Sequence, residues 1–174
     1  MMIEKYRTAL NAGSVSGLLL IVAFIVVYIS GYNPIGSASA MYYWIPLPIL
    51  IRSIRQLKEN EFEGEMPFSA GLKQGLVITF VYSSMFAMLM YLFCTVTEPV
   101  FIDQMASQIA EKLEADKLNQ TNEELYEQYD KIINVMLNNV LGLIAFSELI
   151  SKFIFGAIVT LIASFVFRKP KKRD

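Results

Sequence analysis

The sequence predicts an all-α fold: a four-helix transmembrane bundle with an extramembrane amphipathic helical hairpin between its third and fourth helices. The first observation is that no charged residue lies between Arg7 and Arg52, a stretch of 44 residues. The second is a pair of further uncharged runs, over the 24 residues 74–97 and over residues 153–167. Apolar runs of about 20 residues are typical of helices that cross the ~30 Å hydrocarbon core of a bilayer. The third is composition: 55% of residues are hydrophobic and 18% are charged, whereas soluble domains are about 25% charged.

Composition also narrows the chemistry. The chain has 174 residues, which suits a single integral membrane domain over 1–174, and its net charge of −1 predicts no nucleic-acid partner. It contains no histidine, the residue that most often serves as a general base or metal ligand. The one cysteine, Cys94, lies in an apolar run and is expected to be a small buried hydrophobe. We therefore expect no enzyme activity, no catalytic residue, no metal and no cofactor.

The long uncharged stretch predicts two membrane spans. As one continuous helix it would measure ~66 Å at ~1.5 Å per residue, which is too long for a single crossing. Residues 31–36 read Gly-Tyr-Asn-Pro-Ile-Gly, which is turn chemistry and separates a first span at 10–29 from a second at 38–57. Four spans and a return of the chain to its starting side follow when the later runs are added.

The second span is the least regular of the four. It is apolar only as far as Ile51, so a full crossing requires the two arginines that follow to reach the interface with their charged ends. Pro46 and Pro48 are expected to kink it, and a re-entrant segment remains an alternative. Three aromatic residues are expected to anchor its outer end at the membrane surface: Tyr42, Tyr43 and Trp44.

The third and fourth spans are expected at 72–96 and 140–167. Between them, residues 98–139 hold nine acidic residues and three lysines. Apolar positions recur there at helical spacing on both sides of a polar break at 119–122, which predicts two amphipathic arms. These positions are Phe101, Ile102, Met105, Ile109 and Leu113, and then Leu125, Tyr129, Ile132, Met136 and Val140.

The distribution of basic residues predicts the orientation. Eleven of the fifteen lysines and arginines lie at the two termini or between residues 52 and 73, whereas the segment expected to form the hairpin holds three. Basic residues favour the cytoplasmic side of membrane proteins. Both termini are therefore expected in the cytoplasm and the hairpin outside.

Two pairs of glycines with GxxxG spacing are candidate helix-packing residues: Gly13 with Gly17, and Gly71 with Gly75. Small residues at this spacing let two helices approach closely. Both pairs lie near the cytoplasmic ends of their spans, which predicts a close crossing of the first and third helices. Homodimerisation through the same glycines is the alternative, as is the general abundance of glycine in membrane helices.

Glu148 and Lys152 form a candidate intramembrane polar pair, because residues four apart lie on one face of a helix. Charged residues inside a membrane are often functional. At helical rise, however, they lie ~30 Å and ~24 Å from Arg168 at the inner boundary, close to the outer interface. We expect a structural pair there, with an ion or proton path as the alternative.

Five glutamates of the hairpin form a candidate partner face. The plain alternative is a solvated acidic surface. The residues are Glu111, Glu114, Glu123, Glu124 and Glu127.

The order of several segments is characteristic of one family. It is "YRTALNAGSVSGLLL" in the first span, "IRSIRQLKENEFEGEMPFSAGLKQG" from the end of the second span into the third, then "EPVFID", an acidic segment and a basic tail. In this the chain resembles the bacterial domain-of-unknown-function family 4199, small four-span membrane proteins. The resemblance implies a bacterial inner-membrane location and no established activity.

Three functions are compatible with these features. The first is a non-catalytic membrane component that holds a partner protein or a second copy of itself, through its hairpin or its spans, with the lipid bilayer as its surroundings. The second is a small-solute or ion transporter or channel, which requires polar groups that converge within the membrane. The third is a membrane enzyme that acts on a lipid-linked substrate, and the absence of histidine counts against it.

Overall fold

The computed structural model of the protein describes residues 2–35, 37–118, 131, 135–136 and 139–168. These residues contain helices and no strand, so the predicted all-α class is confirmed. The helices are α1 (Met2–Ile29), the 3₁₀-helix η1 (Ser37–Met41), α2 (Pro46–Glu61), α3 (Phe68–Thr97), α4 (Val100–Leu118) and α6 (Val140–Phe167).

Three of these helices are long and apolar enough to cross a membrane: α1 over Tyr6–Ile29, α3 and α6. Their best windows have mean hydropathies of 2.5, 2.0 and 2.2. The expected spans at 10–29, 72–96 and 140–167 fall within them. Many large apolar side chains on these helices face outward, among them Val22, Met88 and Ile162, which are 55%, 65% and 60% exposed. A soluble protein rarely exposes so much continuous apolar surface, so lipid is the natural solvent for these faces.

The segment expected as a second span is not one helix. Residues 37–41 form η1, a turn follows, and α2 begins at Pro46. Proline is favoured in the first helical turn, where its missing N–H has no partner to lose. The prediction that Pro46 and Pro48 kink a continuous helix over 38–57 is therefore wrong. By itself α2 has 16 residues, ~24 Å of helix, and is not among the helices that qualify as spans.

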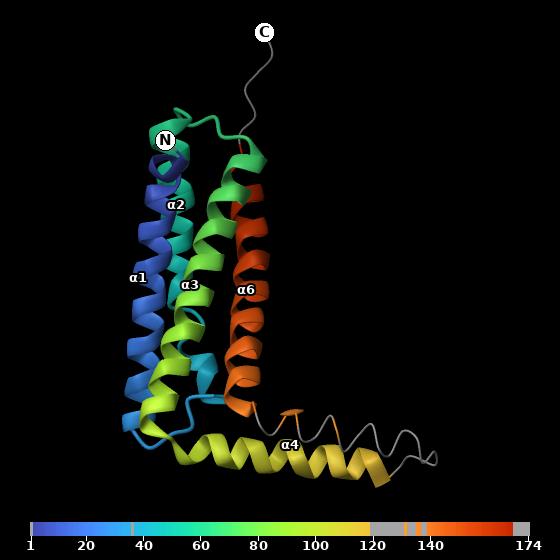
Figure 1. Ribbon diagram of the computed structural model, residues 1–174. Helices are drawn as coiled ribbons and strands as arrows, with labels where there is room; N and C mark the ends of the chain where they lie inside the picture. The colour runs from blue at the N-terminus through green and yellow to red at the C-terminus, as the bar shows by residue number, and fades with distance from the viewer. Residues whose placement is uncertain (1, 36, 119–130, 132–134, 137–138, 169–174) are drawn as a thin grey trace. The chain divides into compact units, whose positions relative to one another are not determined.

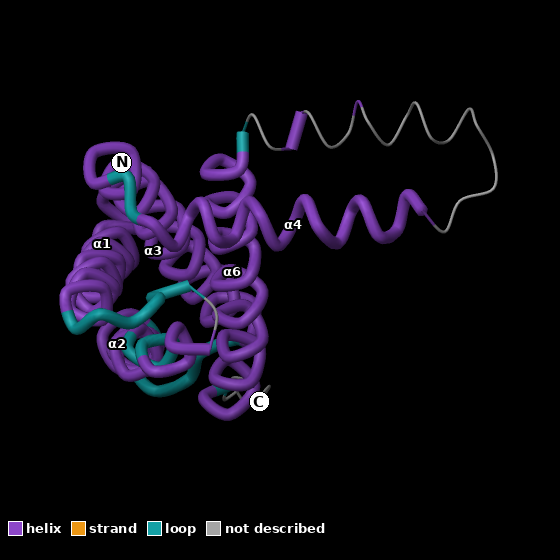
Figure 2. The backbone as a smooth tube through the Cα atoms, turned by 90° about the horizontal axis from the view of Figure 1, so that it is seen from below, coloured by secondary structure: helices purple, strands orange, loops and turns teal. Residues whose placement is uncertain are grey.

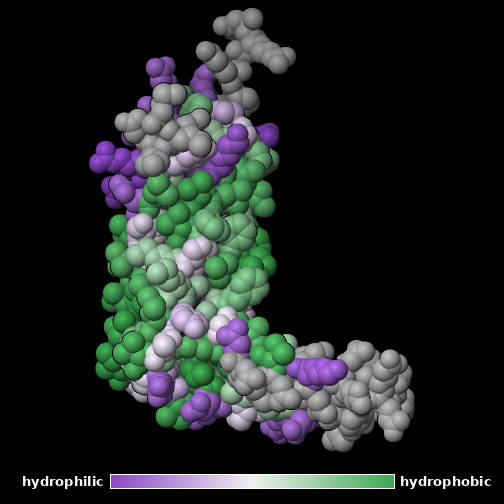
Figure 3. All heavy atoms as spheres, viewed as in Figure 1, coloured by the Kyte–Doolittle hydropathy of each residue, from purple (hydrophilic) through white to green (hydrophobic). Residues whose placement is uncertain are grey.

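Contacts divide the chain into two compact units, Met1–Leu89 with Glu148–Asp174, and Met90–Ser147. In the first unit α1, α2 and the unit's parts of α3 and α6 lie side by side as a bundle (Figures 1 and 2). Successive helices alternate in direction, so α1 begins and α6 ends at the same end of this unit (Figure 1). Figure 3 shows hydrophobic side chains along the middle of one face, with hydrophilic ones gathered toward both ends.

The interior of the bundle is filled by large side chains from α1, α2 and α3. Leu20, Phe24, Ile54, Ile78 and Phe86 are all fully buried. The rings of Phe24 and Phe86 meet edge to face with their centroids 5.9 Å apart. Because lipid tails are as apolar as these residues, such contacts stabilise a membrane bundle through close packing rather than through removal from water.

The first glycine pair brings α1 against α3. A Cβ atom at Gly13 would lie 2.7 Å from the Cβ of Val81 and 3.0 Å from the backbone oxygen of Ile78. A Cβ at Gly17 would lie 3.0 Å from that of Met85. Any larger residue at these positions must push the two helices apart, as expected for small residues at a helix contact.

The second glycine pair has a different partner from the one expected. Gly71 faces Ser164 and Gly75 faces Thr160, both on α6. The close approach of α1 and α3 therefore involves Gly13 and Gly17, and the expectation that Gly71 and Gly75 take part in it is wrong. Four residues along a helix return to nearly the same face, but the spacing alone does not indicate which neighbour that face meets. A glycine of α6 lies equally close to α3: a Cβ atom at Gly156 would meet Thr79 and Tyr82.

In the second unit α3 ends at Thr97, as the dipeptide Glu98-Pro99 predicts. Glu98 has a left-handed backbone with φ of 43°, and its N–H donates to the carbonyl oxygen of Cys94 at 3.0 Å. Pro99 cannot continue the helix, and α4 begins at Val100. The expected first arm is therefore a helix. The turn of the hairpin and most of its second arm lie outside the described residues.

Candidate functional site

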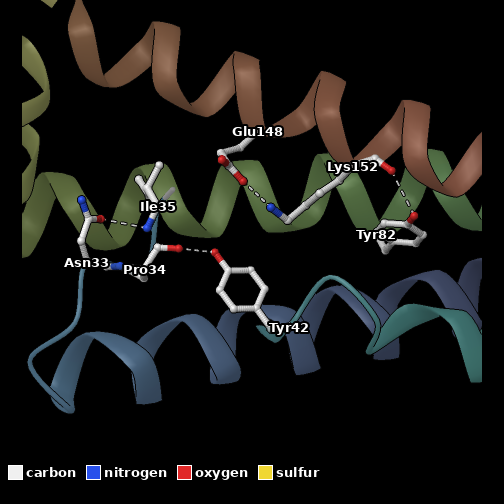
Figure 4. Close-up of polar contacts among 7 residues, drawn as sticks. All are labelled: Asn33, Pro34, Ile35, Tyr42, Tyr82, Glu148 and Lys152. Carbon is white, nitrogen blue, oxygen red and sulfur yellow. Dashed lines mark hydrogen bonds and ion pairs between the residues drawn. The ribbon is translucent and has the colours of Figure 1, made fainter. Parts of the chain in front are cut away.

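The most unusual feature of the bundle is an ion pair in its interior. Glu148 and Lys152 lie one turn apart on α6, and the Lys152 Nζ donates to Glu148 Oε2 (Figure 4). Lys152 is only 2% exposed and Glu148 only 8%. Both side chains therefore turn into the protein. Removing two charges from water costs several kcal/mol per ion, so such a pair requires close compensation.

Aromatic rings supply part of that compensation. The Lys152 Nζ lies 4.0 Å from the ring centroid of Phe86, 4.5 Å from that of Tyr43 and 5.4 Å from that of Tyr42. A cation within about 6 Å of an aromatic face is attracted by the negative ring face. The ammonium group is thus held by one carboxylate and three rings, which come from α3 and from the turn between η1 and α2.

The neighbouring tyrosine hydroxyls bond to the backbone. Tyr42 donates its hydroxyl to the Pro34 carbonyl oxygen at 2.6 Å, and Tyr82 donates to the Lys152 carbonyl oxygen at 3.1 Å (Figure 4). Asn33 accepts a hydrogen bond from the Ile35 N–H at 2.9 Å, which fixes the turn after α1. The Tyr42 bond joins the turns on either side of η1, and the Tyr82 bond joins α3 to α6.

Tyr42 was expected as an interfacial anchor together with Tyr43 and Trp44. It is instead 2% exposed and forms part of the wall around Lys152. Trp44 is 62% exposed and packs edge to face on Phe155 at 5.8 Å between centroids, so only Trp44 has the exposure of an anchor. Helical periodicity did not reveal the role of Tyr42, because the residue lies in a turn between two helices.

Polar side chains also join the helices at two further points of the bundle. Gln74 donates to Ser53 Oγ at 3.4 Å, which connects α3 with α2, and the hydroxyls of Thr79 and Thr160 lie 3.4 Å apart between α3 and α6. Ser83 donates to the Thr79 carbonyl oxygen at 2.8 Å within α3. Interhelical hydrogen bonds of this kind replace the water that a membrane interior lacks.

One buried hydroxyl differs from these. Within the part of the chain that the structure describes, Ser164 Oγ is the buried side-chain oxygen or nitrogen that has no hydrogen-bond partner. A buried polar group left unpaired costs ~1–3 kcal/mol. The small serine side chain suits the close contact with Gly71, because even a Cβ atom at Gly71 would lie 3.1 Å from Ser164 Oγ.

The acidic candidate residues belong to the second unit. Glu111 and Glu114 lie on α4 and are exposed. The other three, Glu123, Glu124 and Glu127, lie outside the described residues. In the described ranges no three His, Cys, Asp or Glu side chains gather closely enough to hold a metal ion.

A family model described as "Protein of unknown function (DUF4199)" matches residues 11–169 of the chain. The chain belongs to DUF4199. The match includes α2, α3, α4, α6 and most of α1, and therefore the whole ion-pair site. Comparison of this DUF4199 protein with curated proteins and with solved structures finds no match.

Proposed function

We propose that this DUF4199 protein is a non-catalytic component of the bacterial inner membrane that holds a partner protein through its segment between α3 and α6. The observation that carries the proposal is the two-sided character of α4. Ile102, Met105 and Ile109 share one face of this helix and are half-buried. The opposite face carries exposed carboxylates of Asp103, Glu111 and Glu114.

A four-span topology is part of the proposal. The segment 37–61 runs back along the bundle from the end where α1 finishes to the end where α1 begins (Figure 1). Its 16-residue α2 measures ~24 Å, and the five residues of η1 add ~10 Å at ~2 Å per residue. Arg52 and the charged residues after it lie at the inner interface, so η1, the turn at 42–45 and the first six residues of α2 cross the ~30 Å hydrocarbon core. With this compound crossing both termini lie on one side of the membrane and α4 on the other, and the basic residues at the termini favour the cytoplasm for that side.

The internal bonding of the bundle supports a structural role for the spans. Lys152 is paired with Glu148, and the Tyr42 and Tyr82 hydroxyls bond to the backbone. Their hydrogen bonds join segments of this chain. The exposed carboxylates of α4 are available to a partner instead. Acidic groups at a surface attract a basic partner and make its binding sensitive to salt.

The test is a pull-down of the full-length protein from native membranes in mild detergent, at low and high salt. A variant with Glu111→Gln and Glu114→Gln should lose a stoichiometric partner that the wild type retains at low salt. The matched control is Glu63→Gln with Glu65→Gln, which removes the same charge from the loop between α2 and α3. Equal recovery of the same proteins by wild type and both variants would contradict the proposal.

A second candidate, an ion or proton carrier, is favoured by one observation, the buried Glu148–Lys152 pair. Intramembrane charges of this kind line transport paths in other proteins. In liposomes, a carrier that uses the pair would lose ion or proton flux when Glu148→Leu and Lys152→Met are combined. A structural pair would leave the fold intact in that variant, and the partner would still be recovered in the pull-down.

A further inference from the structure

A groove of about 430 Å³ lies between α1 and α2 in the first unit. It is open to the surroundings of the bundle rather than enclosed. It is separate from the ion-pair site, since none of the residues around Lys152 lines it. Its walls come from two antiparallel helices (Figure 1). A residue early in α1 therefore lies level with a residue late in α2.

The polarity of the groove changes along its length. At one end lie Thr8 and Asn11 of α1 with Arg52 and Gln56 of α2, and the other end is lined by Val15 and Ile49. Thr8 and Val15 are seven positions apart, as are Ile49 and Gln56, which corresponds to ~10 Å of helix. The polar end of the groove lies toward the end of the bundle where α1 begins and α2 ends. Such a gradient matches an amphiphile with a polar head and an apolar chain.

Arg52 is the cation of this groove, and a second arginine on α2 offers a contrast. Arg55 donates to Glu59 Oε1 at 2.8 Å and does not line the groove. Arg52 is exposed, and no described carboxylate forms an ion pair with it. No residue in the described lining of the groove is acidic. The site is therefore complementary to one negative charge.

We propose that this groove binds the headgroup of an anionic phospholipid such as phosphatidylglycerol. The guanidinium of Arg52 would contact the phosphodiester, because its planar donors match phosphate oxygens in pairs. The side-chain amides of Asn11 and Gln56 and the hydroxyl of Thr8 supply neutral donors around it. One acyl chain would follow Val15 and Ile49 toward the middle of the bundle.

The charge balance selects the lipid class. A zwitterionic headgroup brings an ammonium group, for which the described lining of the groove offers no carboxylate. Basic pockets between helices on the cytoplasmic side are where anionic lipids bind in membrane proteins. The inference rests on the bundle lying in the membrane with this end inward, as proposed above. It does not depend on a partner of α4, so a failed pull-down leaves it standing.

The experiment is native mass spectrometry of the delipidated full-length protein in detergent, titrated with phosphatidylglycerol or phosphatidylcholine. Wild type should bind phosphatidylglycerol in preference, and Arg52→Gln should weaken that binding roughly tenfold, the loss expected for a hydrogen-bonded charge. Arg55→Gln is the matched control and should bind as wild type does. Asn11→Leu should weaken binding by a smaller factor, which tests the polar end without changing the charge.

Three results would overturn the proposal. The first is an unchanged lipid preference in Arg52→Gln. The second is an equal loss in Arg52→Gln and Arg55→Gln, which would indicate a general effect of surface charge. The third is displacement of phosphatidylglycerol by millimolar inorganic phosphate, because a site for a free anion has no use for the apolar half of the groove.

Discussion

Replacing Lys152 with methionine should destabilise the bundle far more than breaking an exposed ion pair of the same spacing. Methionine keeps the unbranched apolar stem but leaves the Glu148 carboxylate without its partner, and Glu148 is only 8% exposed. Removing one member of a buried pair costs ~3–5 kcal/mol. The lost contacts with three aromatic rings are part of this figure.

The chain contains its own control for this prediction. Arg55 and Glu59 form an ion pair of the same spacing at 2.8 Å, with side chains 66% and 54% exposed. Exposed pairs of this kind contribute little to stability, because water and salt screen the two charges. Arg55→Gln should therefore lower the free energy of unfolding far less than Lys152→Met.

The assay is reversible unfolding in mixed micelles of increasing SDS fraction, with the free energy of unfolding compared among variants. Combining Lys152→Met with Glu148→Leu should recover most of the loss, because replacing a buried pair by apolar residues is often neutral or stabilising. If Lys152→Met costs no more than Arg55→Gln, the buried pair is not the structural element described above. If the double variant is as unstable as the single one, lost packing rather than unpaired charge is the cause.

Three further predictions concern packing and hydrogen bonds in the same assay. Gly13→Val should destabilise by ~1–3 kcal/mol, because the added atoms meet Val81 of α3, whereas lipid-facing Val22→Leu should change little. Tyr42→Phe should cost ~1–2 kcal/mol, because the Pro34 carbonyl oxygen loses the hydroxyl that now donates to it. Ser164→Ala should be neutral or stabilising by up to ~1 kcal/mol, since its buried hydroxyl has no described partner; a clear destabilisation would reveal a hydrogen bond there.

The strongest part of the sequence interpretation concerned the long apolar helices. The expected span at 140–167 has the same bounds as α6, because the segment contains no proline and its two charged residues, Glu148 and Lys152, pair one helical turn apart. The segment at 38–57 was harder. Pro46 is compatible both with a kink inside a helix and with the first turn of a new one, and local sequence does not distinguish the two.

Most residues of the ion-pair site could not be predicted from the sequence, because helical periodicity does not show which distant segments come into contact. Glu148 and Lys152 were identifiable as a pair from their spacing. The three rings around Lys152 come from segments more than 60 residues away along the chain, and Tyr42 reaches it from a turn. Likewise, Gly75 was recognisable as a packing residue, but its partner Thr160 on α6 was not.

Cysteine labelling on either side of the segment 37–61 tests whether the protein has the proposed four spans. Single cysteines are introduced as Tyr32→Cys, after α1, and Glu63→Cys, after α2, in a Cys94→Ala background. Both positions are exposed in the bundle. Ser107→Cys on α4 serves as the outer reference.

In intact cells an impermeant maleimide should label Tyr32→Cys and Ser107→Cys, whereas Glu63→Cys should react only after the membrane is permeabilised. That result requires the segment 37–61 to cross the bilayer. Labelling of both Tyr32→Cys and Glu63→Cys from the same side would contradict the four-span topology, because η1 and α2 would then enter and leave the membrane on one face.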